Sequence, residues 1–188
     1  MAYTLEKLVS DCSANIDTTV GRSDLEQIRR CAEMATADPA FVAQYFGSAA
    51  DVGTHTLYQD PDKDFMILAH IKDSGFKSQP HDHGASWAVY CQVAEFVEME
   101  EYARMDDGKE AGIADLELSR RYRLNPGQAG YFDAFQIHSI MVPDKARFMR
   151  ITGTDLSRLE TSSFNTEARS VTIIPPNDEG KVSGDVSV

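Results

Sequence analysis

Apolar positions follow two different periods along the chain, and the change between them lies near residue 50. In the first 47 residues apolar side chains recur three or four positions apart, so that Leu5, Leu8 and Val9 share one helical face. Asp38-Pro39 is typical of a helix start, because proline fits the first helical turn. The pattern predicts helices across residues 3–47 that pack as a layer on a larger core.

From Thr54 onward the apolar residues fall in short runs that are separated by clusters of Asp, Pro, Lys and Gly. Many short strands joined by regular turns predict a mainly β protein, either a sandwich or a barrel. The acidic stretch from Glu95 to Asp107 is interpreted as a solvated strand edge rather than a site. The predicted strands cover residues 54–58, 65–71, 86–93, 95–102, 116–124, 130–134, 137–142 and 147–152, with 171–174 as a further candidate.

The chain of 188 residues is long enough for one structural domain with a sizeable core. Within it we expect three parts. Residues 1–50 form the helical layer, residues 51–160 the barrel, and residues 161–188 an extension that packs on the barrel and has a flexible end.

Charge and cysteine content narrow the range of partners. Acidic side chains outnumber basic ones by 30 to 18, which gives a formal net charge of −12 and argues against nucleic-acid binding. No apolar run is long enough to span a membrane, and the N-terminus lacks a secretion signal. Cys12, Cys31 and Cys91 form no CxxC pair, and their odd number suggests reduced thiols, so we expect a cytoplasmic protein. Its expected partner is a small-molecule substrate.

The chemistry of the chain centres on two histidines that lie two positions apart, His81 and His83, just before a predicted strand. In extended chain, residues i and i+2 point to the same face, so the two imidazoles lie side by side and can bind iron, nickel, copper or zinc. Among the other histidines, His138 follows a later turn and can lie opposite this pair in an antiparallel barrel. We therefore predict a metal site formed by three histidines, and a structural role for His70.

These motifs resemble those of the cupins. Gly75, His81 and His83 are similar to the opening of the first cupin motif, and Gly127 and His138 represent the second. The Pro-His-Asp-His-Gly run, the Asn-Pro-Gly turn and the late His-Ser resemble cysteine and 3-mercaptopropionate dioxygenases most, over roughly residues 25–156. The resemblance implies a cupin double-stranded β-helix, a jelly-roll barrel of the RmlC-like kind, with the helical layer before it. Cupins often pair through barrel edges, so the resemblance is compatible with a homodimer.

The ligand set predicts the type of substrate. Three neutral histidines leave the full divalent charge on the metal, which favours an anionic donor such as a thiolate or enolate. The resemblance implies Fe(II), with nickel, manganese or zinc as alternatives, and O₂ as co-substrate. The predicted function is a cysteine-dioxygenase-like oxygenase that oxidises a small organic anion, most simply a thiol to a sulfinate. The alternatives are a carbon–carbon-cleaving dioxygenase of the β-diketone type and a metal-binding or sensory cupin without turnover.

Several positions depart from the family pattern. Trp87 and Ala88 stand where the cupin glutamate would fall, and Ala88 also lies near the position of the crosslinking cysteine of animal cysteine dioxygenases. The matching position for the arginine that holds the substrate carboxylate is about His55. Arg150 and Thr152 align with the histidine and tyrosine of the family's Ser-His-Tyr set.

These departures give a set of candidate pocket residues. Arg150 alternates with apolar neighbours and is expected to face the barrel interior, where it either binds a substrate anion, assisted by His55, or pairs with a structural carboxylate such as Asp82 or Asp133. Trp87 either forms a wall of the metal pocket or lies in the core. The remaining candidates are Thr152 in the pocket and the hydroxyls of Tyr90 and Tyr131 as hydrogen-bond donors.

Overall fold

The computed structural model describes residues 2–17 and 21–177. Three helices come first, as the apolar period predicts, and each begins at a side chain that accepts a backbone N–H: Thr4, Asp24 and Asp38. A pair of two-residue strands, β1 and β2, joins the first two helices and was not predicted. The bounds are α1 Leu5–Ala14, β1 Ile16–Asp17, β2 Arg22–Ser23, α2 Leu25–Thr36 and α3 Pro39–Phe46.

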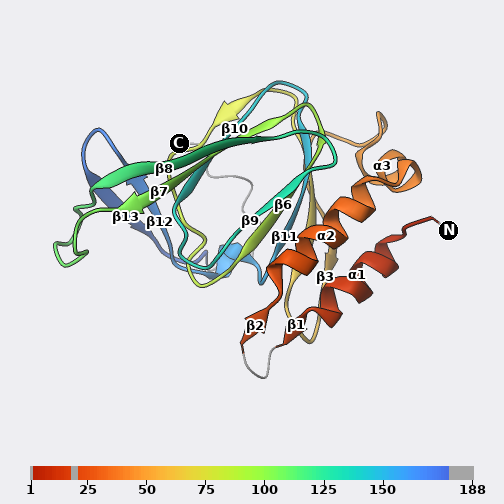
Figure 1. The fold of residues 1–188 in the computed structure, drawn as a ribbon, viewed down its shortest axis with the longest axis horizontal. Coiled ribbons are helices and arrows are strands. Elements are labelled where there is room, and N and C mark those ends of the chain that lie inside the picture. Colours follow the sequence, from red (N-terminus) through yellow and green to blue (C-terminus); the bar gives the residue numbers. More distant parts are fainter. Residues whose placement is uncertain (1, 18–20, 178–188) are drawn as a thin grey trace.

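Residues 53–152 are mainly β and form two antiparallel sheets (Figure 1), and a separate two-stranded sheet follows them. The five-stranded sheet has the order β3-β4-β11-β6-β9, and the four-stranded sheet has the order β5-β10-β7-β8. The strands are β3 Gly53–Gln59, β4 Met66–Ile71, β5 Phe76–Lys77, β6 Ala88–Ala94, β7 Val97–Arg104, β8 Leu116–Leu124, β9 Ala129–Phe132, β10 His138–Val142 and β11 Arg147–Thr152.

From β4 to β11 the chain passes back and forth between the sheets, with β7 and β8 as the one hairpin inside a sheet. This order, with two sheets wound face to face, is the double-stranded β-helix or jelly roll. The predicted fold class, a mainly β jelly-roll barrel with an N-terminal helical layer, is confirmed. Among the described residues, none of the helices combines the length and the apolar character needed to cross a membrane.

The strands of the five-stranded sheet have two different apolar faces. On β6 and β11 one face packs under the helices, through residues such as Val89 and Met149, and the other faces the barrel interior, through residues such as Tyr90 and Phe148. Successive side chains of a strand point to opposite faces, so a continuous apolar run can serve both cores. Arg150, between Met149 and Ile151, lies on the interior face, as the alternation predicts.

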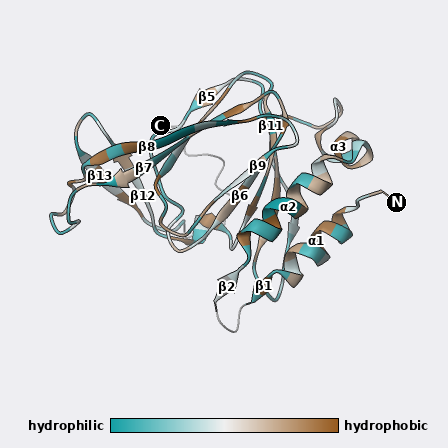
Figure 2. Cartoon of the chain, in the orientation of Figure 1, coloured by the Kyte–Doolittle hydropathy of each residue, from teal (hydrophilic) through white to brown (hydrophobic). Residues whose placement is uncertain are grey.

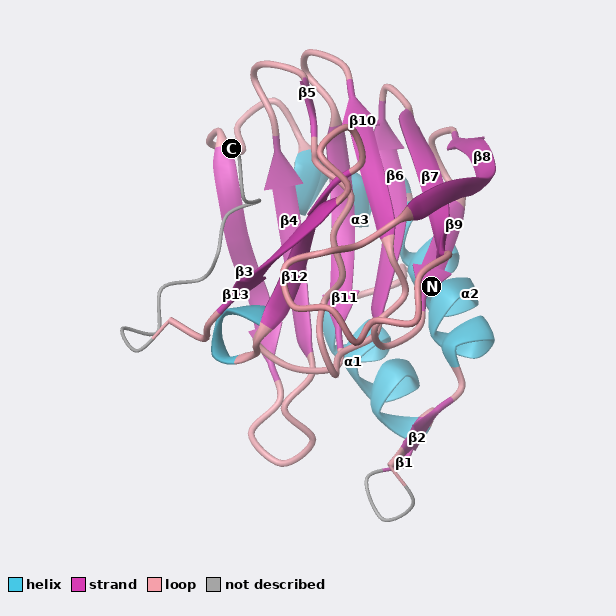
Figure 3. Cartoon of the chain, turned by 90° about the vertical axis from the view of Figure 1, so that its left-hand side faces the viewer, coloured by secondary structure: helices cyan, strands magenta, loops and turns pink. Residues whose placement is uncertain are grey.

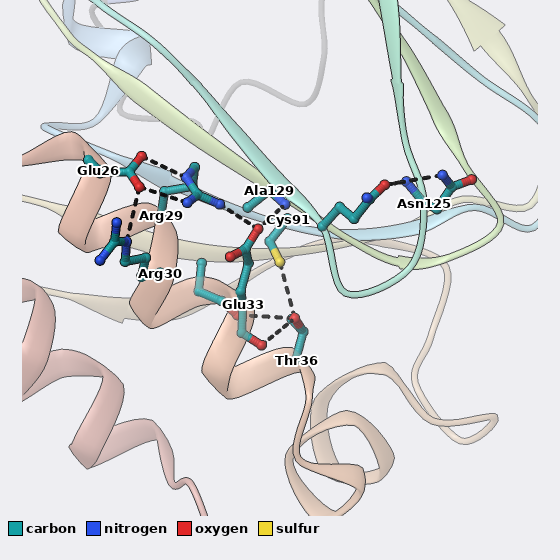
Figure 4. Close-up of polar contacts among 10 residues, drawn as sticks. Glu26, Arg29, Arg30, Glu33, Thr36, Cys91, Asn125 and Ala129 are labelled. Atoms are coloured by element: carbon teal, nitrogen blue, oxygen red, sulfur yellow. Dashed lines mark hydrogen bonds and ion pairs between the residues drawn. The ribbon is translucent and has the colours of Figure 1, made fainter.

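Helix α2 is fixed to the sheet by polar contacts as well as by its apolar face (Figure 4). The carboxylate of Glu33 accepts the backbone N–H of Ala129 on β9 at 3.0 Å, and Arg29 donates to the same carboxylate at 2.6 Å. The hydroxyl of Thr36 lies 3.1 Å from the sulfur of Cys91, and burial raises the pKa of this thiol to about 12. Cys91 is therefore an inert core residue on the outer face of the barrel.

The acidic stretch after Glu95 is not an edge, which corrects the sequence-based interpretation. Strand β7 pairs with β10 on one side and with β8 on the other, so β8 is the edge strand. Its hydrophilic residues predominate in Figure 2. The glutamates of β7 lie opposite arginines of β8. Two ion pairs, Glu98 with Arg123 and Glu100 with Arg121, balance the negative charge of this central strand.

The part of the chain after residue 155 covers one side of the barrel. A short 3₁₀ helix, η1 (Leu156–Arg158), leads into a hairpin of β12 (Thr161–Asn165) and β13 (Ser170–Ile174), and β12 was not predicted. Figure 3 shows this hairpin passing in front of the barrel strands. The flexible end that was expected for the C-terminal extension lies outside the described residues.

Candidate metal centre

Three histidines meet at one end of the barrel interior. His81 and His138 lie directly opposite each other, because the backbone N–H of each donates to the carbonyl of the other, at 2.8 and 2.9 Å. This is a hydrogen-bonded antiparallel pair, in which the two side chains point to the same face. His83, two residues on, completes the group: its ring centroid lies 5.4 Å from that of His81 and 4.7 Å from that of His138.

The backbone after His83 requires glycine. Gly84 has a φ of +57°, which is unfavourable for other residues, and a Cβ at this position would overlap the carbonyl oxygen of Glu160. The chain can therefore turn sharply while the C-terminal segment crosses close to it. The carboxylate of Asp82 strengthens this crossing, because it accepts the N–H groups of Gly84 and Ser162 at 2.9 and 3.0 Å.

Two of the three imidazoles have a defined tautomer. The Nδ1 of His81 lies 2.9 Å from the carbonyl of Gln79, and the Nδ1 of His138 lies 3.0 Å from that of Gln136. A carbonyl can only accept, so both Nδ1 atoms carry the proton and each Nε2 presents a lone pair. Metal-binding histidines are commonly held in this way by a hydrogen bond at the other ring nitrogen.

The electrostatics of the site keep His83 and His138 neutral. Burial lowers the pKa of His83 well below its usual value, and the neighbouring His138 and His81 and the Arg150 guanidinium lower it further. The pKa of His138 is lowered for the same reasons, burial first, although its bond to the Gln136 carbonyl opposes the shift. Neutral imidazole is the form that binds a metal.

The donor set fits a divalent transition metal. One ring nitrogen from each of His81, His83 and His138 lies within 4.8 Å of the other two. The Nε2 of His138 is buried and has no hydrogen-bond partner among the described residues. A buried polar atom without a partner is costly, and a metal ion at the centre of the three rings would satisfy it. Three nitrogen ligands with positions left for other groups are typical of a reactive site rather than a closed structural one.

A cavity lies beside the histidines and is lined in part by His81 and His83. Two other polar side chains, Tyr90 and Arg150, also line it. The register pairs Tyr90 of β6 with Arg150 of β11 directly, and both are buried, with 2% and 5% of their surface exposed. The hydroxyl of Tyr90 lies 3.3 Å from the Nε2 of His83. A phenol and a guanidinium therefore line the cavity together with His81 and His83, whose rings pack against His138. Sequence reasoning named Tyr90 only as a candidate donor, although its position two residues from Ala88 and Gln92 places it on the interior face.

Other sequence-predicted site residues lie elsewhere. Among the described residues that line this cavity, His55, Trp87 and Thr152 are absent. His55 pairs in register with Ala69, whose side chain faces the helices, so it points away from the barrel interior and bonds the carbonyl of Asp51. The neighbouring Thr54 pairs with the interior His70, so the two residues lie on opposite faces of β3.

Trp87 and Thr152 miss the cavity for different reasons. Trp87 shares the outer face of its strand with Val89 and packs on the core beneath the helices. Thr152 is buried on the interior side, but one layer away from Arg150, where its hydroxyl donates to the carbonyl of Thr154 at 2.8 Å. Face and layer are set by strand register, which motif alignment does not supply.

The C-terminal segment provides a wall of the cavity that sequence reasoning did not identify. Its contributions are Leu156, Ser157, Leu159, Thr161, Ser162, Ser163, Ile174, Pro175 and Asn177. No short motif marks these residues as part of a site. They lie near the histidines because β12 runs beside the ligand segment, with Ser163 opposite His81.

Comparisons with known proteins leave the function open. No family model matches the sequence, and no curated protein matches it. Similar solved structures include KdgF from Halomonas sp., at 17% identity and a TM-score of 0.40, over 53% of this chain and 74% of that one. A cupin superfamily protein from Desulfitobacterium hafniense shows 15% identity and a TM-score of 0.40, over 56% and 79%. The DMSP lyase DddQ from Ruegeria pomeroyi shows 13% and 0.37, over 69% and 53%. Because these identities and TM-scores are low, we infer the fold and the function from the strand order and the site geometry of this chain itself.

Proposed function

We propose that this chain is an Fe(II)-dependent dioxygenase that oxidises a small organic anion, most simply a thiolate to a sulfinate. The observation that carries the proposal is a group of three imidazoles, two of which line one cavity together with the Arg150 guanidinium. In the balanced reaction a thiolate and one O₂ give a sulfinate, so that both oxygen atoms end on sulfur.

The role of the metal follows from its ligands. His81, His83 and His138 would hold the ion, and bound Fe(II) would supply redox chemistry and positions for thiolate and O₂ on one centre. Three neutral ligands cancel none of its charge. With Arg150 the inner cavity then carries three positive charges, although the chain as a whole has a formal net charge of −12. Such a site favours an anionic substrate.

The residues around the metal position divide the remaining work. Arg150 is suited to binding a carboxylate, because its planar group donates several hydrogen bonds in fixed directions. Tyr90 can donate a hydrogen bond to an anionic atom bound beside His83. The buried walls keep bulk water from the reacting atoms.

A cavity lined only with apolar groups would favour the β-diketone alternative. The lining includes Arg150 and Tyr90, so the specific observation that would favour the diketone is not met. We keep a β-diketone as one arm of the test.

Oxygen uptake by anaerobically Fe(II)-reconstituted protein tests the proposal. The substrates are cysteine, 3-mercaptopropionate, mercaptosuccinate, cysteamine, which lacks a carboxylate, and a β-diketone. We expect uptake with a carboxylate-bearing thiol, one sulfinate per O₂, and much weaker uptake with cysteamine. Uptake with the diketone alone, or none from iron-loaded protein with any thiol, would contradict the proposal.

The variant Arg150→Gln tests the anion site. It should raise KM for the carboxylate thiol about ten- to hundredfold, because a hydrogen bond to a charged group contributes roughly 1.5–3 kcal/mol. Arg123→Gln is the matched control, since Arg123 pairs with Glu98 on the outer face of the four-stranded sheet. An unchanged KM in an Arg150→Gln protein that still binds iron would favour a structural role for Arg150.

A further inference from the structure

The cavity at the metal centre has two chemically different halves. The inner half is polar and closed: His83, Tyr90 and Arg150 each expose 5% of their surface or less. The outer half is only partly buried, and it combines a group of apolar side chains with polar ones such as Thr161, Ser163 and Asn177. Its apolar side chains come from three separate parts of the chain: Phe76, Leu156, Leu159, Ile174 and Pro175.

Hydrogen bonds within the C-terminal segment hold the apolar side chains of the outer half in place. The η1 segment is fixed by Asp155, whose carboxylate accepts the backbone N–H of Ser157 at 3.0 Å and its hydroxyl at 2.8 Å. The chain after β13 is tied to the same turn, because the N–H of Asn177 donates to the carbonyl of Ser157 at 2.7 Å. These contacts hold Leu156 and Leu159 on one side of the cavity and Ile174 and Pro175 beside them.

A three-carbon thiol acid would leave this outer half unused. With its thiolate at the metal position and its carboxylate at Arg150, both charged groups lie in the inner half. Partly exposed apolar side chains around a cavity gain free energy when a ligand covers them, roughly in proportion to the apolar area removed from water. The outer half thus offers binding energy that only a larger substrate can use.

We propose that the substrate is a small organic anion that also carries an apolar group, about the size of a phenyl ring or a short branched alkyl chain. The anionic end binds at Arg150, and the apolar group lies against Phe76, Leu159 and Ile174. This inference rests on the proposed function for the metal and the thiol, but the ligand class can be tested by binding alone.

The binding test uses calorimetry on the full-length protein, with and without Fe(II) and in the absence of oxygen. The probes are 3-phenylpropionate, propionate and 3-phenylpropanamide. We expect 3-phenylpropionate to bind at least tenfold more tightly than propionate, which lacks the ring, and than the amide, which lacks the charge. Equal affinity for propionate and 3-phenylpropionate would overturn the inference.

A matched pair of variants locates the apolar group. Leu159→Ala should weaken 3-phenylpropionate binding severalfold and leave propionate binding unchanged, because it removes apolar surface only from the outer half. Leu118→Ala, an exposed leucine on the outer strand β8, is the control and should change neither affinity. Equal losses for both ligands in Leu159→Ala would contradict the placement of the ring.

A kinetic arm separates the two proposals. Iron-loaded protein should oxidise 2-benzyl-3-mercaptopropionate with a kcat/KM at least tenfold above that of 3-mercaptopropionate. If 3-phenylpropionate binds as predicted and neither thiol is oxidised, the reaction is wrong and the ligand class stands. If both thiols are oxidised with equal kcat/KM and both carboxylates bind equally, the ligand class is wrong and the reaction stands.

Discussion

Two regions of the barrel interior each bury a histidine completely, yet only one region has the features of a metal centre. His70 stacks on Phe148 with the ring centroids 4.5 Å apart, and His138 stacks on Phe132 at 3.7 Å. Both rings have a polar contact at Nδ1, His70 with the hydroxyl of Thr54 at 3.1 Å. Burial, stacking and a bonded ring nitrogen therefore do not distinguish them.

The neighbours make the difference. His138 has two further imidazoles with centroids within 4.7 Å, whereas His70 lies among Thr54, Phe148 and the interior face of β4. Among the described residues, the group able to hold a metal consists of His81, His83 and His138 and excludes His70. A buried histidine is thus most simply a core residue, unless strand register brings other ligands to it.

Removing one histidine from each region should give the largest contrast. His138→Ala is expected to reduce bound iron from about one ion per chain to less than a tenth of that, because two imidazoles hold the ion much more weakly. His70→Asn should retain the wild-type amount, as measured by elemental analysis of reconstituted protein whose fold is checked by circular dichroism. Full iron occupancy in His138→Ala would contradict the ligand assignment.

Added metal should stabilise the protein by binding in the region of His138 and not in that of His70. At a free metal concentration about 100 times Kd, binding adds about 2.7 kcal/mol to the free energy of unfolding, or roughly 5–10 °C in Tm for a chain of this size. Anaerobic thermal denaturation with and without Fe(II) should show this shift in wild type and in His70→Asn. The shift should be absent in His138→Ala. Equal shifts in all three proteins would place the metal elsewhere.

The next largest effect is expected on kcat, from removal of the Tyr90 hydroxyl. Tyr90→Phe removes the hydroxyl that lies 3.3 Å from the Nε2 of His83, and should lower kcat about fivefold while iron content stays unchanged, since one hydrogen bond contributes roughly 1 kcal/mol. Tyr131→Phe is the control, because Tyr131 packs against the core on the outer side of the barrel. Steady-state oxygen uptake measures both variants. Equal losses in the two would show that Tyr90 has no special role.

The smallest expected effect is on the free energy of unfolding, to which Glu100 contributes beside the strand that carries His138. Glu100 accepts the hydroxyl of the neighbouring Ser139 at 3.0 Å and that of Tyr102 at 2.7 Å. Burial raises the pKa of Glu100, but these bonds and those from Lys77 and Arg121 outweigh it and lower the pKa to about 2. The folded-state pKa lies below the unfolded one, so this stabilisation is present above about pH 4.5 and is lost as the pH falls toward 2.

Glu100→Gln should therefore lower the free energy of unfolding at pH 7 by about 1 kcal/mol, because solvent screens the exposed arginine and lysine partners. Denaturant unfolding from pH 7 to pH 2 should show the difference from wild type shrinking below pH 4.5. Glu98→Gln, at a more exposed pair on the same strand, should stay within roughly 0.5 kcal/mol of wild type. A pH-independent difference for Glu100→Gln would contradict the charge-based account.

The sequence predicted the fold class and the pairing of His81 with His138, because both depend on local alternation and on short-range turns. Residues i and i+2 of a strand share a face wherever the strand lies, so the HxH pair could be interpreted without the fold. Arg150 was placed on the interior face by the same reasoning. These predictions rest on periodicity, the most direct structural signal in a sequence.

The predictions that were wrong depend on register and on distant packing. His55 lies on the outer face of β3, away from the cavity that it was expected to line. Of the two alternatives for Trp87, the pocket wall fails and the core position holds. Strand β12 is rich in serine and threonine and becomes a cavity wall only through its pairing beside His81. Such contacts join residues some 80 positions apart, and the local pattern does not specify them.

X-ray absorption spectroscopy at the iron edge tests the central claim most directly. Anaerobically reconstituted protein should show scattering from three imidazoles and from light oxygen or nitrogen ligands, and no sulfur. Addition of a carboxylate-bearing thiol should add one sulfur to the iron shell, while His138→Ala should bind too little iron to give the signal. A sulfur ligand in the free protein, or no sulfur after saturation with every thiol tested, would contradict a three-histidine centre that binds an anionic thiolate.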